Sequence, residues 1–336
     1  MKSRQPLVCI CIPLYNNEKT IRCTLDSLLD QDYENLIIKV FDNASIDSSL
    51  AIAHGYALNN PNVIVFSREE TVSGEDNFNT CIENADGDYT AIFHSDDVYD
   101  SRIISAQVAF LEKHLQSGAV STHADVIDKN GVLISERFIP NELRNCDASG
   151  VELTRNELLT LIFGYGNFVT CPSVLFRTKI LKEDIKKFRG DLFMSSSDLD
   201  VWLRISEVSN FGFIPQKLIR YRKSDASFSY NLAKVRIEDH DMFLVLNYYL
   251  DKFNDNKKDL NKKLDFLLMK DRANTNLNRM ALNSGDFKLI KMSWCGFSVF
   301  HAKYYLIALM VKFILKVPFK EKLFGFLIRE LKIKNA

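Results

Sequence analysis

Continuous apolar runs alternate with helically spaced apolar residues in the first part of the chain. The run from Leu7 to Ile12 contains only apolar residues, as expected for a β-strand that is covered on both faces. Downstream, Ile21, Leu25 and Leu28 recur at the spacing of one helix face. A second apolar run, from Leu36 to Phe41, predicts the next strand. The chain is therefore expected to begin with a strand, a helix and a strand.

The same alternation continues to residue 127. It predicts strands over 62–66, 89–93 and 119–127, and helices over 47–58, with Asp47 as its cap, 78–85 and 101–115. Such an order predicts an α/β fold with βαβ units and a mainly parallel sheet. In that sheet the carboxyl ends of the strands share one edge, where ligands bind. Tyr15, Asp42 and Asp96 each follow a different strand, so we expect them to converge there.

The second half of the chain is less regular. The expected elements are a hairpin over 132–139, a helix over 157–163, an apolar stretch over 169–176, a helix over 198–208 and a strand over 211–221. Beyond Ser229 the sequence has a helical pattern throughout. These features predict an α/β domain over 1–228, followed by a helical region over 229–336 that is basic and amphipathic toward its end.

Composition narrows the class of protein. The 43 basic residues balance the 43 acidic ones, which argues against a nucleic-acid partner. The seven cysteines form no CxxC pair, which fits a reducing compartment. The longest uncharged apolar stretch near the end, Tyr304 to Val311, is far shorter than the roughly 20 residues that span a bilayer. We expect a cytoplasmic protein, peripheral at the inner face of the cell membrane if it contacts lipid at all.

Two adjacent carboxylates, Asp96 and Asp97, end the strand over 89–93. Like charges so close repel each other unless a cation lies beside them, and Mg²⁺ is commonly held by one or two carboxylates together with substrate phosphates. The alternative is a solvated turn. Asp42, at the end of another strand, favours the metal interpretation, because a carboxylate there can bond a nucleotide's base or ribose.

Four ordered motifs in the first hundred residues carry a resemblance. They are Pro13-Leu14-Tyr15-Asn16-Asn17-Glu18, the Thr24-Leu25-x-Ser27-Leu28 block with Gln31, Asp42-Asn43-Ala44-Ser45-Ile46-Asp47-Ser48, and Ala85-x-Gly87-Asp88-Tyr89 leading to His94-Ser95-Asp96-Asp97. Together they resemble family 2 glycosyltransferases, over about residues 6 to 225. The resemblance implies a GT-A fold and an inverting enzyme of the type that acts in bacterial cell-surface polysaccharide synthesis.

The resemblance also implies a nucleotide-sugar donor and a divalent metal, Mg²⁺ or Mn²⁺. The metal ligands would be Asp96, with Asp97 in support. The residues assigned to the donor nucleotide are Pro13, Tyr15, Glu18, Asp42, Asn77, His94, Ser95 and Asp96. His94 stands where the family's metal motif usually begins with an acidic residue, so it contacts ribose or phosphate or is a structural histidine. Gly74 and Asn77 shape the donor pocket or form an ordinary loop and cap.

On the acceptor side, the segment from Ser195 to Arg204 resembles the family block whose acidic residue is the general base, and Asp198 matches that position. The alternative makes Asp198 a helix N-cap. Contacts with phosphate or acceptor are expected from Asp200, Trp202, Arg204 and Arg222. The alternatives are that Trp202 lies in the core, that Arg204 forms an internal ion pair and that Arg222 lies in a solvated loop. Ser224 stands where the family often has a histidine.

The end of the chain carries ten basic and two acidic residues from Phe287 onward, interleaved with aromatic and aliphatic ones. This pattern predicts either an amphipathic helix on anionic lipid or a helical cap on the α/β domain. Membrane contact would suit a lipid-linked saccharide acceptor. Two other classes stay open: a nucleotidyltransferase, although the loop after the first strand has no Gly, Lys or Arg, and a non-catalytic GT-A-like binding protein. The oligomeric state is left open.

Overall fold

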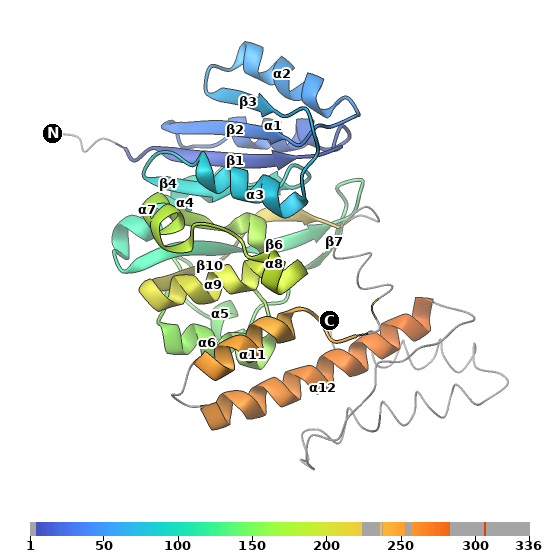
Figure 1. Ribbon diagram of the computed structural model, residues 1–336. Coiled ribbons are helices and arrows are strands. Elements are labelled where there is room, and N and C mark those ends of the chain that lie inside the picture. Colours follow the sequence, from blue (N-terminus) through green and yellow to red (C-terminus); the bar gives the residue numbers. More distant parts are fainter. Residues whose placement is uncertain (1–4, 224–235, 237, 253–256, 283–305, 307–336) are drawn as a thin grey trace. The chain divides into compact units, whose positions relative to one another are not determined.

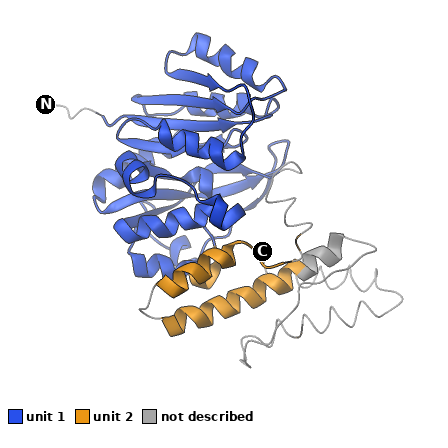
Figure 2. Ribbon diagram, in the orientation of Figure 1, with its two compact units in different colours: residues 1–162, 167–224 blue, residues 163–166, 225–336 orange. Residues whose placement is uncertain are grey.

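The computed structural model describes residues 5–223, 236, 238–252, 257–282 and 306. The chain divides into two compact units, one of residues 1–162 and 167–224 and one of residues 163–166 and 225–336 (Figure 2). The predicted boundary at residue 228 falls among residues outside the described part and stays a prediction.

Unit 1 is built on one ten-stranded sheet with the path β3-β2-β1-β4-β9-β6-β10-β5 (Figure 1). Its strands are β1 (Val8–Leu14), β2 (Leu36–Asp42), β3 (Val63–Ser67), β4 (Tyr89–Ile92), β5 (Val98–Tyr99), β6 (Ser117–Ile127), β7 (Leu133–Glu136), β8 (Val151–Leu153), β9 (Leu175–Arg177) and β10 (Asn210–Arg222). Strands β1 to β4 pair in parallel. Strand β9 runs against both β4 and β6, so β6 and β10 point the same way as the first four. The predicted α/β fold with a mainly parallel sheet is confirmed.

Strand β1 is covered on both faces, as its apolar run predicts. Its residues Val8, Ile10, Ile12 and Leu14 belong to the core cluster shared with α1 (Ile21–Leu29), α2 (Ser49–Asn59) and α4 (Ile103–Lys113). On the opposite face, the Cys11 thiol lies 3.6 Å from the carbonyl of Cys81 in α3 (Gly74–Glu83). The remaining helices of unit 1 are α5 (Asn141–Arg144), α6 (Arg155–Tyr165), which runs into unit 2, α7 (Thr178–Ile180), α8 (Gly190–Phe193) and α9 (Ser197–Val208).

Three predicted boundaries shift for local reasons. Strand β1 continues through Pro13, because its pairing with β4 ends at Cys11 and no neighbour there needs the N–H that proline lacks. Helix α3 begins at Gly74 because the Ser73 hydroxyl caps it, accepting the Asp76 N–H at 3.1 Å. Helix α2 begins at Ser49 with Ser48 as N-cap, while Asp47, one residue earlier, accepts the Ser49 N–H at 2.9 Å.

Helix α9 carries a buried ion-pair cluster and an aromatic anchor. The fully buried Asp200 carboxylate accepts hydrogen bonds from Arg189 Nε and Arg204 Nε, both at 2.9 Å. Trp202 is also fully buried, with its ring 6.0 Å from Phe176 and 5.8 Å from Phe211. Both side chains fix α9 to unit 1.

Unit 2 contains two described helices, α11 (Met242–Lys252) and α12 (Lys257–Leu282). Phe243, Leu246, Leu264 and Leu267 are among their buried apolar residues. These helices agree with the helical pattern expected beyond Ser229. The basic tail from Phe287 onward lies outside the described residues, apart from Leu306. In the part of the chain that the structure describes, no helix has the length and apolarity that crossing a bilayer requires.

Replacing Asp200 with alanine is expected to lower the free energy of unfolding by about 3–5 kcal/mol, because two guanidinium groups lose the buried carboxylate that both contact. Asp191→Ala is the matched control, since Asp191 pairs with Lys187 on the surface and its side chain is 64% exposed. This control should change stability by less than about 1 kcal/mol. Urea unfolding followed by tryptophan fluorescence measures both, and equal effects would contradict the buried cluster.

Candidate active site

The loops that follow β1, β2 and β4 meet at one edge of the sheet. The parallel register aligns Leu14 with Asp42 and Cys11 with Ile92, so the three strands end side by side. The predicted convergence of the strand ends is therefore confirmed. Within it Tyr15 is 46% exposed, whereas Asp42 is buried.

Side-chain hydrogen bonds cross-link these loops. The Asn17 amide donates to the Ser95 hydroxyl at 2.6 Å, which joins the loop after β1 to that after β4. Asn16 N–H donates to the Ser45 hydroxyl at 3.0 Å, which joins it to the loop after β2. Glu18, exposed on the surface, accepts the Ser48 N–H at 3.1 Å. Glu18 thus supports the loop structure, in addition to its predicted contact with the nucleotide.

The turn after β2 contains a strained residue. Ala44 has φ +56°, a conformation that alanine rarely adopts. The Asp42 carboxylate stabilises the turn by accepting the Ser45 N–H at 3.0 Å with Oδ2. Backbone strain of this kind is concentrated at functional sites.

Two acceptor atoms near the end of β2 have no hydrogen-bond partner within the described residues. They are Asp42 Oδ1 and Asn77 Oδ1, both buried. The Asn77 amide nitrogen donates to the Phe41 carbonyl in β2 at 3.1 Å, so its side chain is held at the end of that strand. A buried unsatisfied acceptor costs about 1–3 kcal/mol, so both atoms suit the N–H or O–H donors of a ligand.

A candidate metal centre lies in the loop after β4. One ligand atom each of His94, Asp96 and Asp97 lie within 4.8 Å of one another. Of these groups, His94 Nε2 and Asp97 Oδ2 are buried and lack a hydrogen-bond partner among the described residues. Burial lowers the pKa of His94, which favours the neutral imidazole that ligates metals. Burial, and then the charge of Asp96, raise the pKa of Asp97 well above its ordinary value. A divalent cation at this place would lower the pKa of Asp97 and so offset the effects of burial and of the Asp96 charge on that carboxyl.

Arg222 fixes this loop in place. Its amide donates to Asp97 Oδ1 at 2.7 Å and its Nε to the Asp96 carbonyl at 2.6 Å. Its Nη1 donates to the carbonyls of Asp128 and Lys129 at 3.1 and 3.2 Å. Arg222 therefore positions the carboxylates through main-chain contacts, which differs from the predicted contact with phosphate. Ser224, the next position of interest, lies outside the described residues.

Asp198 lies in the first turn of α9, whose N-cap is Ser196. Its Oδ1 accepts the Leu199 N–H at 2.7 Å, and its Oδ2 accepts the Asn167 amide at 2.9 Å. Burial raises the pKa of the Asp198 carboxyl, against the opposing effects of the Leu199 and Asn167 bonds and the charge of Arg137. A half-buried carboxyl with a raised pKa is suited to exchanging protons.

Cys171 links the two acidic centres. Burial raises the pKa of its thiol, and the charges of Asp198 and Asp97 raise it further. The charges of both carboxylates therefore affect the pKa of the same thiol. This relation joins residues 101 positions apart in sequence.

Three residues predicted to contact phosphate or acceptor have other surroundings. Trp202 packs among buried aromatic rings, Asp200 binds two arginines, and Arg204 donates to Asp200 and to the Ile185 and Lys187 carbonyls. These observations favour the core and ion-pair alternatives. Conversely, the sequence did not predict Asn167 and Cys171 as site residues, because neither lies in a recognised motif or in an amphipathic pattern.

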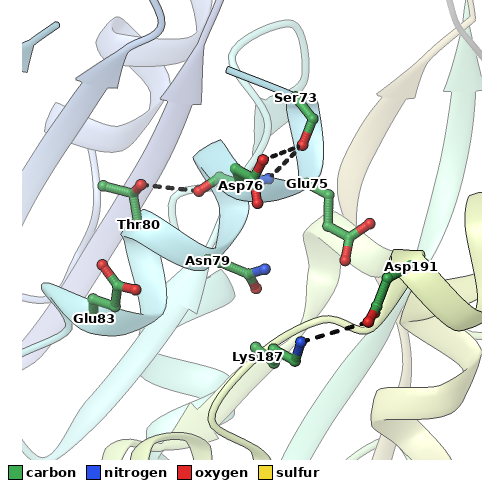
Figure 3. A pocket seen from close by; sticks show the side chains of 8 residues that line it. All are labelled: Ser73, Glu75, Asp76, Asn79, Thr80, Glu83, Lys187 and Asp191. Atoms are coloured by element: carbon green, nitrogen blue, oxygen red, sulfur yellow. Dashed lines mark hydrogen bonds and ion pairs between the residues drawn. The ribbon is translucent and has the colours of Figure 1, made fainter.

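A separate hollow of about 550 Å³ lies between α3 and residues 187–191 (Figure 3). Glu75, Asp76, Glu83 and Asp191 make it acidic, and Lys187 pairs with Asp191 at 3.8 Å. No atom lining it is among the buried polar atoms that lack a partner in the described part of the chain. The edge with Asp42, His94, Asp97 and Asp198 is therefore the stronger candidate site.

Solved structures resemble the chain over most of its length. The structure of Staphylococcus aureus TarS residues 1–349 in complex with UDP-GlcNAc matches with a TM-score of 0.61 at 19% identity, over 83% of this chain and 76% of that one. The mannosyltransferase PcManGT of Pyrobaculum calidifontis, in complex with GDP-Man and Mn²⁺, matches with a TM-score of 0.52 at 17% identity, over 97% and 86%. At these identities the likeness concerns the fold, which is the predicted GT-A fold.

Sequence comparison identifies the family. The Bacillus subtilis (strain 168) protein EpsE, which carries a glycosyltransferase name, is 30% identical over 235 residues, 68% of this chain and 78% of EpsE. A glycosyltransferase of Rickettsia typhi is 28% identical over 238 residues, 70% of each chain. The model of glycosyl transferase family 2 matches residues 9–183. The chain therefore belongs to glycosyl transferase family 2.

Proposed function

We propose that this glycosyltransferase is inverting and metal-dependent, and that it moves a sugar from a nucleoside-diphosphate sugar to an acceptor hydroxyl. One observation carries the proposal: the His94, Asp96 and Asp97 ligand atoms gather within 4.8 Å at the same edge as the unpartnered oxygen of Asp42. Asp198, whose carboxyl pKa is raised by burial and whose oxygens are held by Leu199 N–H and Asn167, is the proposed base. Donor, cation and base thus have separate places in one site.

The donor's nucleotide binds over the ends of β1 and β2 in this proposal. Asp42 Oδ1 and Asn77 Oδ1 accept hydrogen bonds from the base or ribose, and the exposed Tyr15 ring covers the nucleotide. Pro13 shapes the floor of the pocket, and Ser95 is held by Asn17 at its edge. The structures with UDP-GlcNAc and GDP-Man on the same fold support a nucleotide-sugar donor.

The diphosphate lies toward Asp96, and His94, Asp96 and Asp97 hold a divalent cation, Mg²⁺ or Mn²⁺. When bound, the cation neutralises charge on the departing diphosphate. The chain's own contribution is to fix the ligands: Arg222 and Thr24 bond Asp96 and Asp97 through main-chain atoms, the Thr24 hydroxyl at 2.7 Å from the Asp97 carbonyl. The PcManGT structure with Mn²⁺ supports a metal on this fold.

Asp198 removes the proton of the acceptor hydroxyl as that oxygen attacks the anomeric carbon. The Asn167 amide holds one carboxylate oxygen and the Leu199 N–H holds the other, so the group is oriented before the acceptor arrives. Attack on the face opposite the diphosphate inverts the anomeric centre without a covalent enzyme intermediate. Family membership removes the nucleotidyltransferase alternative. The alternative of a non-catalytic binding protein predicts no sugar transfer, and the transfer assay below tests it.

Asp96→Asn is expected to weaken metal-dependent UDP binding by about 100-fold, because the substitution removes a ligand charge from the cation's site. Isothermal titration of UDP with Mn²⁺, and again with EDTA, measures the metal-dependent part. Asp184→Asn, which replaces an exposed carboxylate, is the control and should bind as the wild type does. Unchanged metal-dependent binding by Asp96→Asn would show that the cation lies elsewhere.

Asp198→Asn is expected to reduce sugar transfer by about 10²–10⁴-fold while UDP binding stays at the wild-type level, since the amide cannot accept the proton. Transfer of a labelled sugar to a panel of acceptors gives the rate, and NMR of the product gives its anomeric configuration. Full transfer by Asp198→Asn, or a product with retained configuration, contradicts the assignment.

The same residue predicts a pH dependence. The base must be ionised, and the pKa of Asp198 is raised above the ordinary 3.8. Activity is therefore expected to be complete above the raised pKa and to fall as pH decreases through it, with a midpoint above 3.8. The pH profile of kcat/KM measures this limb. UDP binding over the same range is the control, and an identical limb there would assign the titration to donor binding.

The proposed acceptor is a saccharide, lipid-linked, in bacterial cell-surface polysaccharide synthesis, and the basic tail would bring the enzyme to the membrane. Flotation with vesicles of anionic lipid is expected to carry the full chain but not a version that ends at Ser284, because anionic headgroups attract the tail's lysines. Vesicles of neutral lipid are the control. Equal flotation of both versions would contradict the membrane role of the tail.

A further inference from the structure

Arg137 follows β7 and is fixed through its main chain. Its N–H donates to the Ala124 carbonyl in β6 at 2.9 Å, and its own carbonyl lies 2.9 Å from Nε2 of His123. Burial lowers the pKa of His123, so the ring is neutral, and Nε2 carries the proton because a carbonyl only accepts. The backbone of Arg137 is thereby held on the central sheet.

The guanidinium of Arg137 lies near an aromatic ring. Its central carbon lies 5.7 Å from the centre of the Tyr221 ring, and its buried Nε has no hydrogen-bond partner within the described residues. Two other arginines of unit 1 have protein partners: Arg177 donates to the Ser117 and Leu111 carbonyls, and Arg144 pairs with Glu136 at 2.6 Å. A planar guanidinium with unused donors matches the oxygens of a phosphate or carboxylate.

The main chain of Arg137 and the turn that follows Asn167 both contact β6. The Ser173 hydroxyl donates to the Thr122 carbonyl at 3.1 Å, two residues before Ala124, so the 171–173 turn lies beside the segment that holds Arg137. Asn167, just upstream of this turn, donates to Asp198 and keeps a buried Oδ1 without a partner in the described part of the chain.

The electrostatic relations agree with this placement. The charge of Arg137 lowers the pKa of Asp198 against the larger effect of burial. By contrast, the charges that act on the pKa of Asp97 are those of Asp96 and Arg222. Arg137 therefore belongs to the Asp198 side of the site, apart from the centre that would hold the cation and the donor diphosphate.

We propose that Arg137 binds an anionic group, a phosphate, on the acceptor, while the unpartnered Oδ1 of Asn167 accepts from an acceptor hydroxyl beside Asp198. The acceptor class is thus a phosphorylated saccharide or polyol. This inference rests on the proposed role of Asp198 as the base. The donor diphosphate offers the same chemistry to a guanidinium, and the experiment separates the two sources.

The test compares phosphorylated and neutral forms of the same probe. Glucose 6-phosphate with glucose, and glycerol 3-phosphate with glycerol, are titrated into the full chain with UDP and Mn²⁺ present. We expect the phosphorylated member of each pair to bind about tenfold more tightly, the effect of one charge-assisted contact. Arg137→Gln should abolish this preference, and Arg144→Gln, which removes a nearby paired cation, should preserve it. UDP affinity should be unchanged in both variants.

Equal binding of the phosphorylated and neutral probes by the wild type would overturn the proposal. A parallel loss of UDP and phosphate-probe affinity in Arg137→Gln would assign Arg137 to the donor and overturn it as well. If thermal unfolding shows that Arg137→Gln does not fold, Arg137→Lys replaces it. Lysine keeps the charge but lacks the planar guanidinium, so the preference for the phosphorylated probe should fall by several-fold. If UDP does not bind the wild type, the proposed donor site is contradicted, but the Arg137 proposal is not. The phosphorylated and neutral probes are then compared in the absence of UDP.

Discussion

The parallel register of β1 with its neighbours β2 and β4 is the constraint on which the rest of the site depends. It brings the ends of three strands to one level, with Leu14 beside Asp42 and Cys11 beside Ile92. Short hydrogen bonds such as Asn17 to Ser95 then hold the loops together. Since the loop groups satisfy one another, the acceptor atoms left over, Asp42 Oδ1 among them, are available to a ligand.

The charges at this edge indicate where a cation would bind. Asp97 is fully buried beside a second carboxylate, an arrangement that is unfavourable without a counter-charge. Arg222 donates its main-chain amide to the Asp97 carboxylate and its guanidinium to main-chain carbonyls. A cation at His94, Asp96 and Asp97 would supply the missing charge. The charge of Arg137 lowers the pKa of Asp198, which agrees with the proposed roles of Asp198 as the base and of Arg137 as the site of an anionic group on the acceptor.

Helix α9 shows where prediction from sequence succeeds and where it fails. The pattern from Asp198 to Val208 predicted the helix, and the motif singled out Asp198 within it. Asp200, Trp202 and Arg204 came from the same motif, yet they lie in an ion-pair cluster or among aromatic rings. Asp200 lies two positions from Asp198 and therefore on another side of the helix, whereas Trp202 lies four positions away and on the same side, so spacing alone does not say which of these residues faces the site. The partners of Asp200 and Trp202 decide this, and they come from other elements.

The sequence by itself determined the βαβ order, the carboxylates at the strand ends and the family, because these depend on local periodicity and on motifs of adjacent residues. Only the tertiary structure decided which side chains complete the site. Asn167 meets Asp198 across 31 positions, and Arg222 meets Asp97 across 125. Arg137 follows β7, and its position depends on the pairing of that strand with β6. Such contacts arise from packing between distant segments, and no local pattern of polar and apolar residues encodes them.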